Sequence, residues 1–175
     1  MRSLHILLPL LAMTACGPEE TDDEEGGVTG EILDGTWRML PGSAPVDSCG
    51  QGDAALDDIE GDDEEWFLDL VMDGDTVFAT PETGEEEACV FDGASYVCEG
   101  YSDAVDFSSA GYDAQLDIVG SRWLDFTSDV AGTMSYEITS TCTGADCDDP
   151  MVQTLNGGIP TTCEVLLQWP LEHVE

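Results

Sequence analysis

The chain has no lysine, and three arginines supply all of its strongly basic side chains. Against them stand 39 aspartate and glutamate residues, so the formal net charge at pH 7 is −36. Nucleic-acid binding depends on Lys and Arg that neutralise phosphates, so this composition excludes it. The same shortage excludes attachment to anionic lipid through a basic patch, and phosphate-rich ligands would be repelled.

Side chains that usually carry catalysis are also scarce. Histidine occurs only at His5 and His173, and His173 lies too near the carboxyl end to be held rigidly between a nucleophile and a carboxylate. The lack of lysine excludes a Schiff base, and there is no glycine-rich phosphate loop. We therefore expect a protein that is not an enzyme and has no catalytic residues. The alternative is a carbohydrate-active enzyme with two carboxylates, but among 39 acids a suitably spaced pair is weak support.

The first 15 residues have the layout of a secretory signal peptide. Arg2 precedes an apolar run at residues 4–13 that is too short to span a bilayer. The run ends in Leu-Ala-Met-Thr-Ala-Cys, which resembles the lipobox of bacterial lipoproteins. The resemblance implies cleavage before Cys16, lipidation of its sulfur and a lipid anchor in the bacterial cell envelope. Gly17 is not the aspartate that resembles an inner-membrane retention signal, so we expect the outer membrane.

Composition divides the chain into three segments. Residues 1–15 are the expected signal peptide. Residues 16–29 contain the cysteine and an acidic stretch that cannot form a core, so we expect a disordered, self-repelling tether. Residues 30–175 are long enough for one domain with a substantial hydrophobic core.

The cysteines after Cys16 are six in number: Cys49, Cys89, Cys98, Cys142, Cys147 and Cys163. An even number in an exported chain indicates three disulfides. Gly93-Ala94 suits a two-residue hairpin turn, and counting outward from it places Cys89 opposite Cys98 at a non-hydrogen-bonded pair. We therefore predict a cross-strand disulfide there. The other four cysteines allow three pairings, one of which joins Cys142 to Cys147 and Cys49 to Cys163, and the sequence does not choose among them.

Alternation of apolar and polar residues with turn signals between predicts an all-β domain. It is clearest at residues 66–72, 112–118, 130–138 and 163–171. Asp73-Gly74 predicts a hairpin with Val77 opposite Leu70, and Gly120-Ser121 leads from one segment into the next. Residues 41–65 and 144–162 are predicted as long loops. The pattern is typical of an antiparallel meander, closed as a barrel or folded as a β-sandwich, and held by disulfides.

Near the start of the domain, Gly35-Thr36-Trp37 resembles the G-x-W that opens the first strand of lipocalins and of other small β-barrel envelope lipoproteins. The resemblance implies a barrel plugged at one end by Trp37, and as one alternative function it implies carriage of a small apolar ligand. It covers three residues and the strand pattern, and the T-D-Y motif of lipocalins has no counterpart. No arginine lies on the last strand to cover the tryptophan, so Arg38 and Arg122 are the candidates for that cover.

Calcium is the only cofactor for which residues can be named. Asp146, Asp148 and Asp149 are the candidate ligands, because neighbouring cysteines and Pro150 would hold the backbone. The sequence as a whole predicts a membrane-anchored extracytoplasmic lipoprotein with a non-catalytic β-domain for binding or envelope structure. Its partner would be an envelope protein, a glycan or a small ligand.

Overall fold

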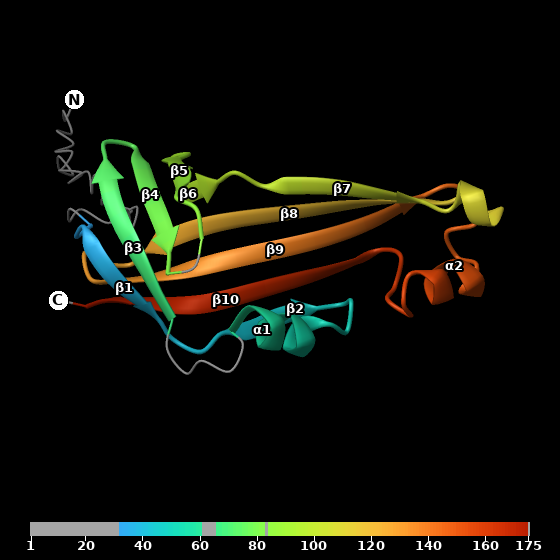
Figure 1. Cartoon of the computed structure of the whole chain (residues 1–175), viewed down its shortest axis with the longest axis horizontal. Helices are drawn as coiled ribbons and strands as arrows, with labels where there is room; N and C mark the ends of the chain where they lie inside the picture. Colours follow the sequence, from blue (N-terminus) through green and yellow to red (C-terminus); the bar gives the residue numbers. More distant parts are fainter. Residues whose placement is uncertain (1–31, 61–65, 83, 175) are drawn as a thin grey trace, which may run out of the picture.

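The computed structural model describes residues 32–60, 66–82 and 84–174 of the 175-residue chain. The expected signal peptide, Cys16 and the acidic tether lie outside these ranges. The elements in chain order (Figure 1) are β1 (Gly35–Met39), β2 (Ser43–Asp47), α1 (Gly52–Glu60), β3 (Trp66–Asp73), β4 (Thr76–Pro81), β5 (Glu87–Phe91), β6 (Tyr96–Cys98), β7 (Tyr101–Asp106), the 3-10 turn η1 (Ser108–Ala110), β8 (Gln115–Phe126), β9 (Ala131–Thr143), α2 (Pro150–Leu155) and β10 (Cys163–His173).

Eight antiparallel strands close into a barrel, which confirms the all-β prediction and selects the barrel over the sandwich. The strands follow the order β1-β3-β4-β5-β6-β8-β9-β10 around the ring. The last strand, β10, pairs with the first, β1, and closes the ring, with Trp37 opposite His173. Closure gives each strand of the ring a partner on both sides, which removes the open edges that a flat sheet would expose.

The barrel interior is a packed hydrophobic core. Its side chains come from alternate positions along each strand, as the period-two pattern predicts. The largest of them, each almost without accessible surface, are Trp37, Leu70, Val77, Leu124, Leu167, Trp169 and Leu171. Large side chains therefore occupy the space in which a carrier of an apolar ligand would hold its cargo.

Trp37 is fully buried at one end of the barrel, beside the last residues of β8 and β10, and we call this the plugged end. Its indole N–H donates to the carbonyl oxygen of Leu33 at 3.1 Å. The rings of Phe126 and His173 pack edge-on against it, with centroids at 5.3 Å and 5.4 Å. These two rings supply the cover expected from an arginine. Arg38 instead pairs with Glu172 on the neighbouring strand at 2.8 Å.

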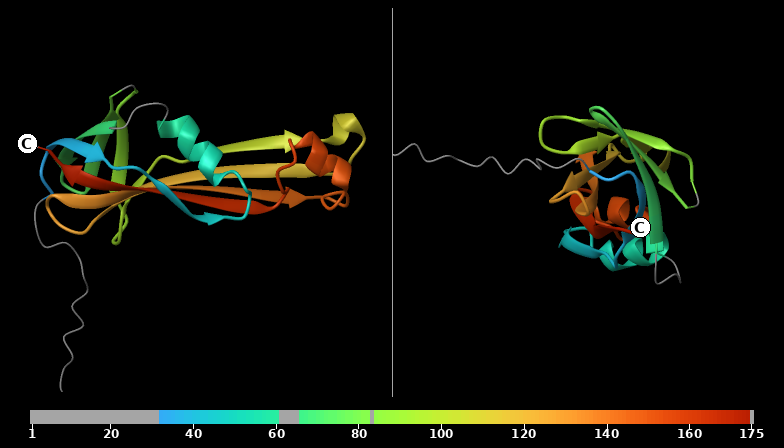
Figure 2. Two further views of the ribbon diagram at one scale, coloured as in Figure 1. Left: turned by 90° about the horizontal axis from the view of Figure 1, so that it is seen from below. Right: turned by 90° about the vertical axis from the view of Figure 1, so that its left-hand side faces the viewer.

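β8, β9 and β10 continue past the barrel and form an extension (Figure 1). There β7 pairs with the first half of β8, and β2 pairs with the first half of β10, so the extension is an open five-stranded sheet. Its far end has a second, separate core made of Phe107, Ala114, Leu116 and Val152. Val152 belongs to α2, and α1 and α2 both lie on the side of the long strands that continues the barrel interior (Figure 2). We call this side the inner side.

Two predicted connections were wrong. The β3–β4 hairpin pairs Leu70 with Ala79. Its pairing extends to Asp73 opposite Thr76, which leaves a two-residue loop whose first residue is Gly74, with φ +61°. The predicted register was therefore off by two residues, and the same face still points inward because side chains alternate with period two. Gly120-Ser121 is no connection, since β8 runs through it as one strand of 12 residues.

The two predicted long loops contain regular structure. Residues 41–65 include β2 and α1, and residues 144–162 include α2. α1 is tied to the barrel by the Glu60 carboxylate, whose Oε1 accepts from the indole N–H of Trp169 at 2.9 Å and from the Gly42 N–H at 2.7 Å. Both helices are short, nine and six residues, so neither produces a long helical periodicity in the sequence.

Three disulfides hold the domain. Cys89–Cys98 joins β5 to β6 in the predicted register, with Val90 opposite Val97 as its neighbouring pair. Cys49–Cys163 and Cys142–Cys147 are the other two, which is one of the three pairings that the sequence left open.

Candidate functional site

Two of the three acids named as calcium ligands, Asp146 and Asp149, accept hydrogen bonds from nearby backbone N–H groups. Asp146 Oδ2 accepts from the backbone N–H of Asp113 at 2.7 Å. Asp149 caps α2, accepting from the backbone N–H of Met151 at 2.7 Å. The Asp146 bond ties the loop around the Cys142–Cys147 disulfide to the residues just before β8, whereas the Asp149 bond stays within the first turn of α2.

The three acids are not brought together as a set of ligands. Within the described ranges, only Glu87, Cys89 and Cys98 place three ligand-type atoms within 4.8 Å of one another. The two cysteines are bonded to each other in a disulfide, so they are not available as thiolates. The geometry of the described residues therefore gives no support to a calcium or zinc centre.

A different stretch stands out on the inner side of the extension, between the two cores. Tyr101, Val105, Ile118 and Ile138 face this side but belong to neither core. Tyr101 is 46% exposed and Val105 is 37% exposed, which is unusual for apolar side chains on the inner side of a sheet. Together with two residues at the barrel rim they form what we call the inter-core face: Tyr101, Val105, Ile118, Arg122, Tyr136 and Ile138.

The inter-core face is bordered on three sides and ends at β7, whose outer edge is open within the described residues. α1, packed on β2 and β10, lies along the side opposite β7 (Figure 2). The barrel stands at one end and α2 with the second core at the other. The face is thus part of a sheet that is fixed at both ends, which suits a preformed binding surface.

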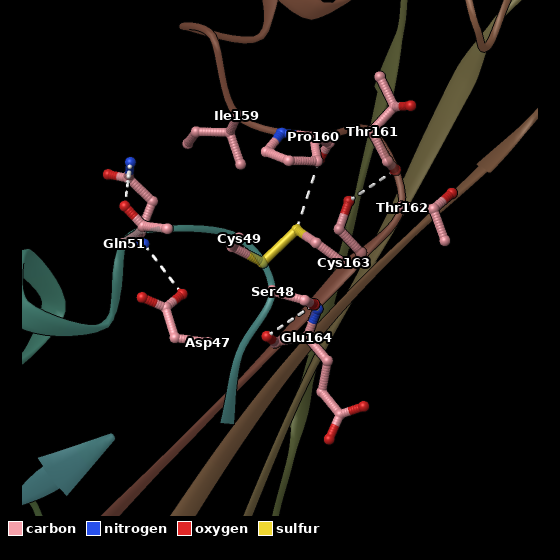
Figure 3. Close-up of a disulfide and its surroundings, with 12 residues drawn as sticks. Asp47, Ser48, Cys49, Gln51, Ile159, Pro160, Thr161, Thr162, Cys163 and Glu164 are labelled. Carbon is pink, nitrogen blue, oxygen red and sulfur yellow. Dashed lines mark hydrogen bonds between the residues drawn. A yellow bond between two sulfur atoms is a disulfide. The ribbon is translucent and has the colours of Figure 1, made fainter. Parts of the chain in front are cut away.

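The Cys49–Cys163 disulfide fixes the α1 side of this frame (Figure 3). It joins the corner between β2 and α1 to the first residue of β10. Beside it, Ser48 and Glu164 exchange backbone and side-chain hydrogen bonds at 2.7–2.9 Å. Asp47 accepts from the backbone N–H groups of Gln51 and Gly52, and these bonds lower the pKa of its carboxyl, the bond from Gly52 most.

Gly120 determines how Tyr101 sits on the sheet. The two residues are cross-strand partners, and a Cβ added at position 120 would lie 2.1 Å from Cε1 of the Tyr101 ring. Only glycine allows the ring to lie across β8 at this point, because any side chain would occupy its place. The backbone of β8 therefore supports the Tyr101 ring directly while much of the ring stays open to solvent.

An ion pair and a second tyrosine form the barrel end of the face. Arg122 Nη1 lies 3.1 Å from Glu87 Oε2, and the guanidinium carbon lies 5.9 Å from the centre of the Tyr136 ring. The Tyr101 and Tyr136 rings are 6.4 Å apart and tilted by 44°. Burial, and then hydrogen bonding to Tyr101, raises the pKa of Tyr136, so its hydroxyl stays neutral at any physiological pH.

The inter-core face combines an aromatic platform, aliphatic floor residues and fixed polar groups. Glu87 compensates the charge of Arg122, so the face offers hydrogen-bonding groups rather than a net positive charge. Such a surface can bind a ligand that has both apolar and polar parts. The described residues around it do not include the histidine, because His173 lies at the plugged end of the barrel.

Sequence reasoning did not identify this face. In the sequence, Arg122 is a candidate only for covering Trp37, and no strand is predicted over the residues of β7 that contain Tyr101. One signal was available, because a glycine inside an alternating strand pattern indicates a bulge or a close approach of another group. Gly120 is such a glycine, but its partner could be identified only once β7 was paired with β8.

No helix in the described ranges is long and apolar enough to cross a bilayer. No protein-family model matches the chain, and the comparisons with curated proteins and with solved structures found no significant similarity.

Proposed function

We propose that this chain is an exported, lipid-anchored binding protein that holds its ligand on the inter-core face. The observation that carries the proposal is the exposed, glycine-supported Tyr101 beside Tyr136 and the Arg122–Glu87 pair, on the inner side of the sheet between the two cores. The barrel and its disulfides serve as the rigid scaffold. The protein binds its ligand and does not catalyse a reaction on it.

Export is supported by the three disulfides, because such bonds form in oxidising compartments. Anchoring rests on the lipobox resemblance at Cys16. The described domain begins at the plugged end of the barrel, where Leu33 and Trp37 meet. An anchor that precedes residue 32 would therefore attach at the barrel end and leave the extension pointing away from it.

Anchoring is tested by detergent phase partitioning of the full chain beside a Cys16→Ala variant. The proposal expects the wild-type chain to enter the detergent phase with the mass of a lipid-modified protein, and the variant to stay in the aqueous phase. Equal partitioning of both chains, with no lipid mass, would remove the anchor from the proposal.

Ligand binding is tested with the four tyrosines as reporters. Tyr101 and Tyr136 lie in the inter-core face, whereas Tyr96 lies by the plugged end and Tyr112 packs on the second core. With ring-labelled tyrosine, a ligand on the face should shift the first two signals and leave the other two unchanged. A set of amphipathic probes that shifts none of the four, or only Tyr96 and Tyr112, would contradict the proposed site.

A lipocalin-like carrier of an apolar ligand is the weaker alternative. It would need space inside the barrel, and that interior is occupied by side chains such as Trp37, Leu70 and Leu167, which have no accessible surface. We therefore place the ligand outside the barrel, on the inter-core face.

A further inference from the structure

Resting on the proposed function, we propose that the ligand of the inter-core face is a neutral saccharide, with a sugar ring stacked on Tyr101. The shape of the site supports this ligand class first. The outer face of the Tyr101 ring is available, and the β8 backbone at Gly120 supports the ring from below. A sugar ring has an apolar C–H face that packs on an aromatic ring and an edge of hydroxyls that needs hydrogen-bonding partners.

The polar groups at the barrel end match such an edge. The Arg122–Glu87 pair supplies donors and acceptors, and Arg122 Nε is buried without a hydrogen-bond partner within the described residues. A wholly apolar ligand would cover this ion pair without replacing its contacts with water, which is costly. Sugar hydroxyls can replace those contacts because each one both donates and accepts.

Charge restricts the saccharide to a neutral one. The chain carries a formal charge of −36, and the single arginine on the face is already compensated by Glu87. Uronic, sulfated or phosphorylated sugars would therefore meet repulsion without a free cation to bind them. Asp103 is exposed on the same face of β7 as Tyr101 and adds to that repulsion.

A peptide added as an extra strand fits less well. Within the described ranges β7 pairs only with β8, so its other edge is open. However, the outward N–H of Ala104 already donates to Asp103 Oδ1 at 2.8 Å. On the opposite edge of the sheet, β2 has Pro45, which lacks an N–H. Each edge therefore has one fewer free N–H donor for an added strand, which disfavours strand addition.

A cationic ligand is the main competitor, because the field of the protein attracts cations and an exposed ring can bind them. The experiment therefore uses the full chain in detergent, with ring-labelled tyrosine, and four kinds of probe. These are neutral tetrasaccharides of glucose, mannose and N-acetylglucosamine, an anionic tetragalacturonate, tetramethylammonium, and the apolar probe indole. Binding is measured from the Tyr101 and Tyr136 shifts and by calorimetry.

The expected result is that at least one neutral tetrasaccharide shifts Tyr101 and Tyr136 and binds more tightly than the other probes. Tyr101→Ala should weaken that binding on the order of tenfold, the loss seen when a ring that stacks on a planar ligand is removed. Tyr101→Phe should keep most of the affinity because the ring remains. Phe91→Ala is the matched control, since Phe91 is 42% exposed at the other end of the barrel and should not matter.

Other outcomes separate the ligand class from the site. If tetramethylammonium, tetragalacturonate or indole binds best with the same dependence on Tyr101, the neutral saccharide is wrong and the site stands. If a neutral saccharide binds but Tyr101→Ala has no effect, the inferred position is wrong. If no probe shifts Tyr101 or Tyr136, the inference and the proposed function both fail.

Discussion

The barrel and the extension share the three long strands β8, β9 and β10, yet different interactions stabilise them. In the barrel, closure pairs every strand on both sides and encloses one large core that includes two tryptophans. In the extension, the sheet stays open at β7 and β2, the main core continues only along β10 through Val165 and Cys163, and a second small cluster lies at the far end. Two of the three disulfides, Cys49–Cys163 and Cys142–Cys147, hold the extension.

The difference indicates where a binding surface can exist on this protein. Apolar side chains inside a closed barrel of this size pack against one another and fill its interior. In the extension the main core continues along β10 through Val165 and Cys163, whereas Tyr101 and Val105 on β7 stay exposed between the two cores. Covalent links then maintain a shape that burial alone would not, as in other domains with small cores.

The largest expected effect comes from removing the disulfide with the longest loop. Cys49 and Cys163 are 114 residues apart, and the chain-entropy model assigns such a loop about 4 to 5 kcal/mol of stability. The double variant Cys49→Ala/Cys163→Ala should lose roughly that much free energy of unfolding in urea titration. The matched variant Cys142→Ala/Cys147→Ala, with a separation of 5, should lose only about 2 kcal/mol. Equal losses would mean that loop length does not control the contribution.

The next effect compares one leucine from each core. Leu70 and Leu116 are both almost fully buried, so either change to alanine should cost about 3 kcal/mol of local stability. We expect Leu70→Ala to accelerate amide hydrogen exchange across the whole barrel. Leu116→Ala should accelerate it mainly in α2 and the adjoining ends of β8 and β9. Uniform acceleration by both variants would show that the two regions unfold as one unit.

A smaller effect should appear at the inter-core face. Gly120→Ala would push a Cβ into the Tyr101 ring and should cost about 1 to 3 kcal/mol through overpacking. In a chain that already has Tyr101→Ala, the same change should cost much less, because the ring that it displaces is gone. Thermal or urea unfolding of the four chains gives the coupling energy directly. A coupling near zero would mean that Tyr101 does not rest on Gly120.

The smallest effect is a pH dependence at the corner of α1. Hydrogen bonds from the backbone N–H groups of Gly52 and Gln51 hold the pKa of Asp47 below the ordinary value of 3.8. The folded state therefore gains stability from Asp47 above pH 3.8, and loses it as the pH falls through the lowered pKa. Asp47→Asn should be less stable than wild type at neutral pH, with the difference disappearing once the pH falls below the lowered pKa of Asp47. A difference that is constant from pH 7 to pH 2 would contradict this role.

Local signals predicted the fold class and the strongest pairings. Alternation in residues 66–72 and 163–171 gave the inward faces, and the turn at Gly93 gave the Cys89–Cys98 register. The β3–β4 register failed because two hairpin registers two residues apart bury the same side chains. The sequence did not predict α1 and α2, because helices of nine and six residues give little periodicity.

The candidate site was beyond prediction for a different reason. Tyr101, Arg122 and Tyr136 are unremarkable within their own segments, and they come together only because β7, β8 and β9 pair in one register. The sequence does not indicate where one core ends and the other begins. That boundary depends on which strands extend beyond the barrel strands with which they pair.

The sequence by itself determined the charge of −36, the alternation that makes an antiparallel β-domain, and the one disulfide that a tight turn places in register. These properties are local or additive, so a reader of the sequence can count them. Only the tertiary structure decided the closure of β1 on β10, the pairing of Cys49 with Cys163, and the open stretch between the cores. Each of these depends on contacts between residues far apart in the chain, and the pattern of any one segment does not specify them.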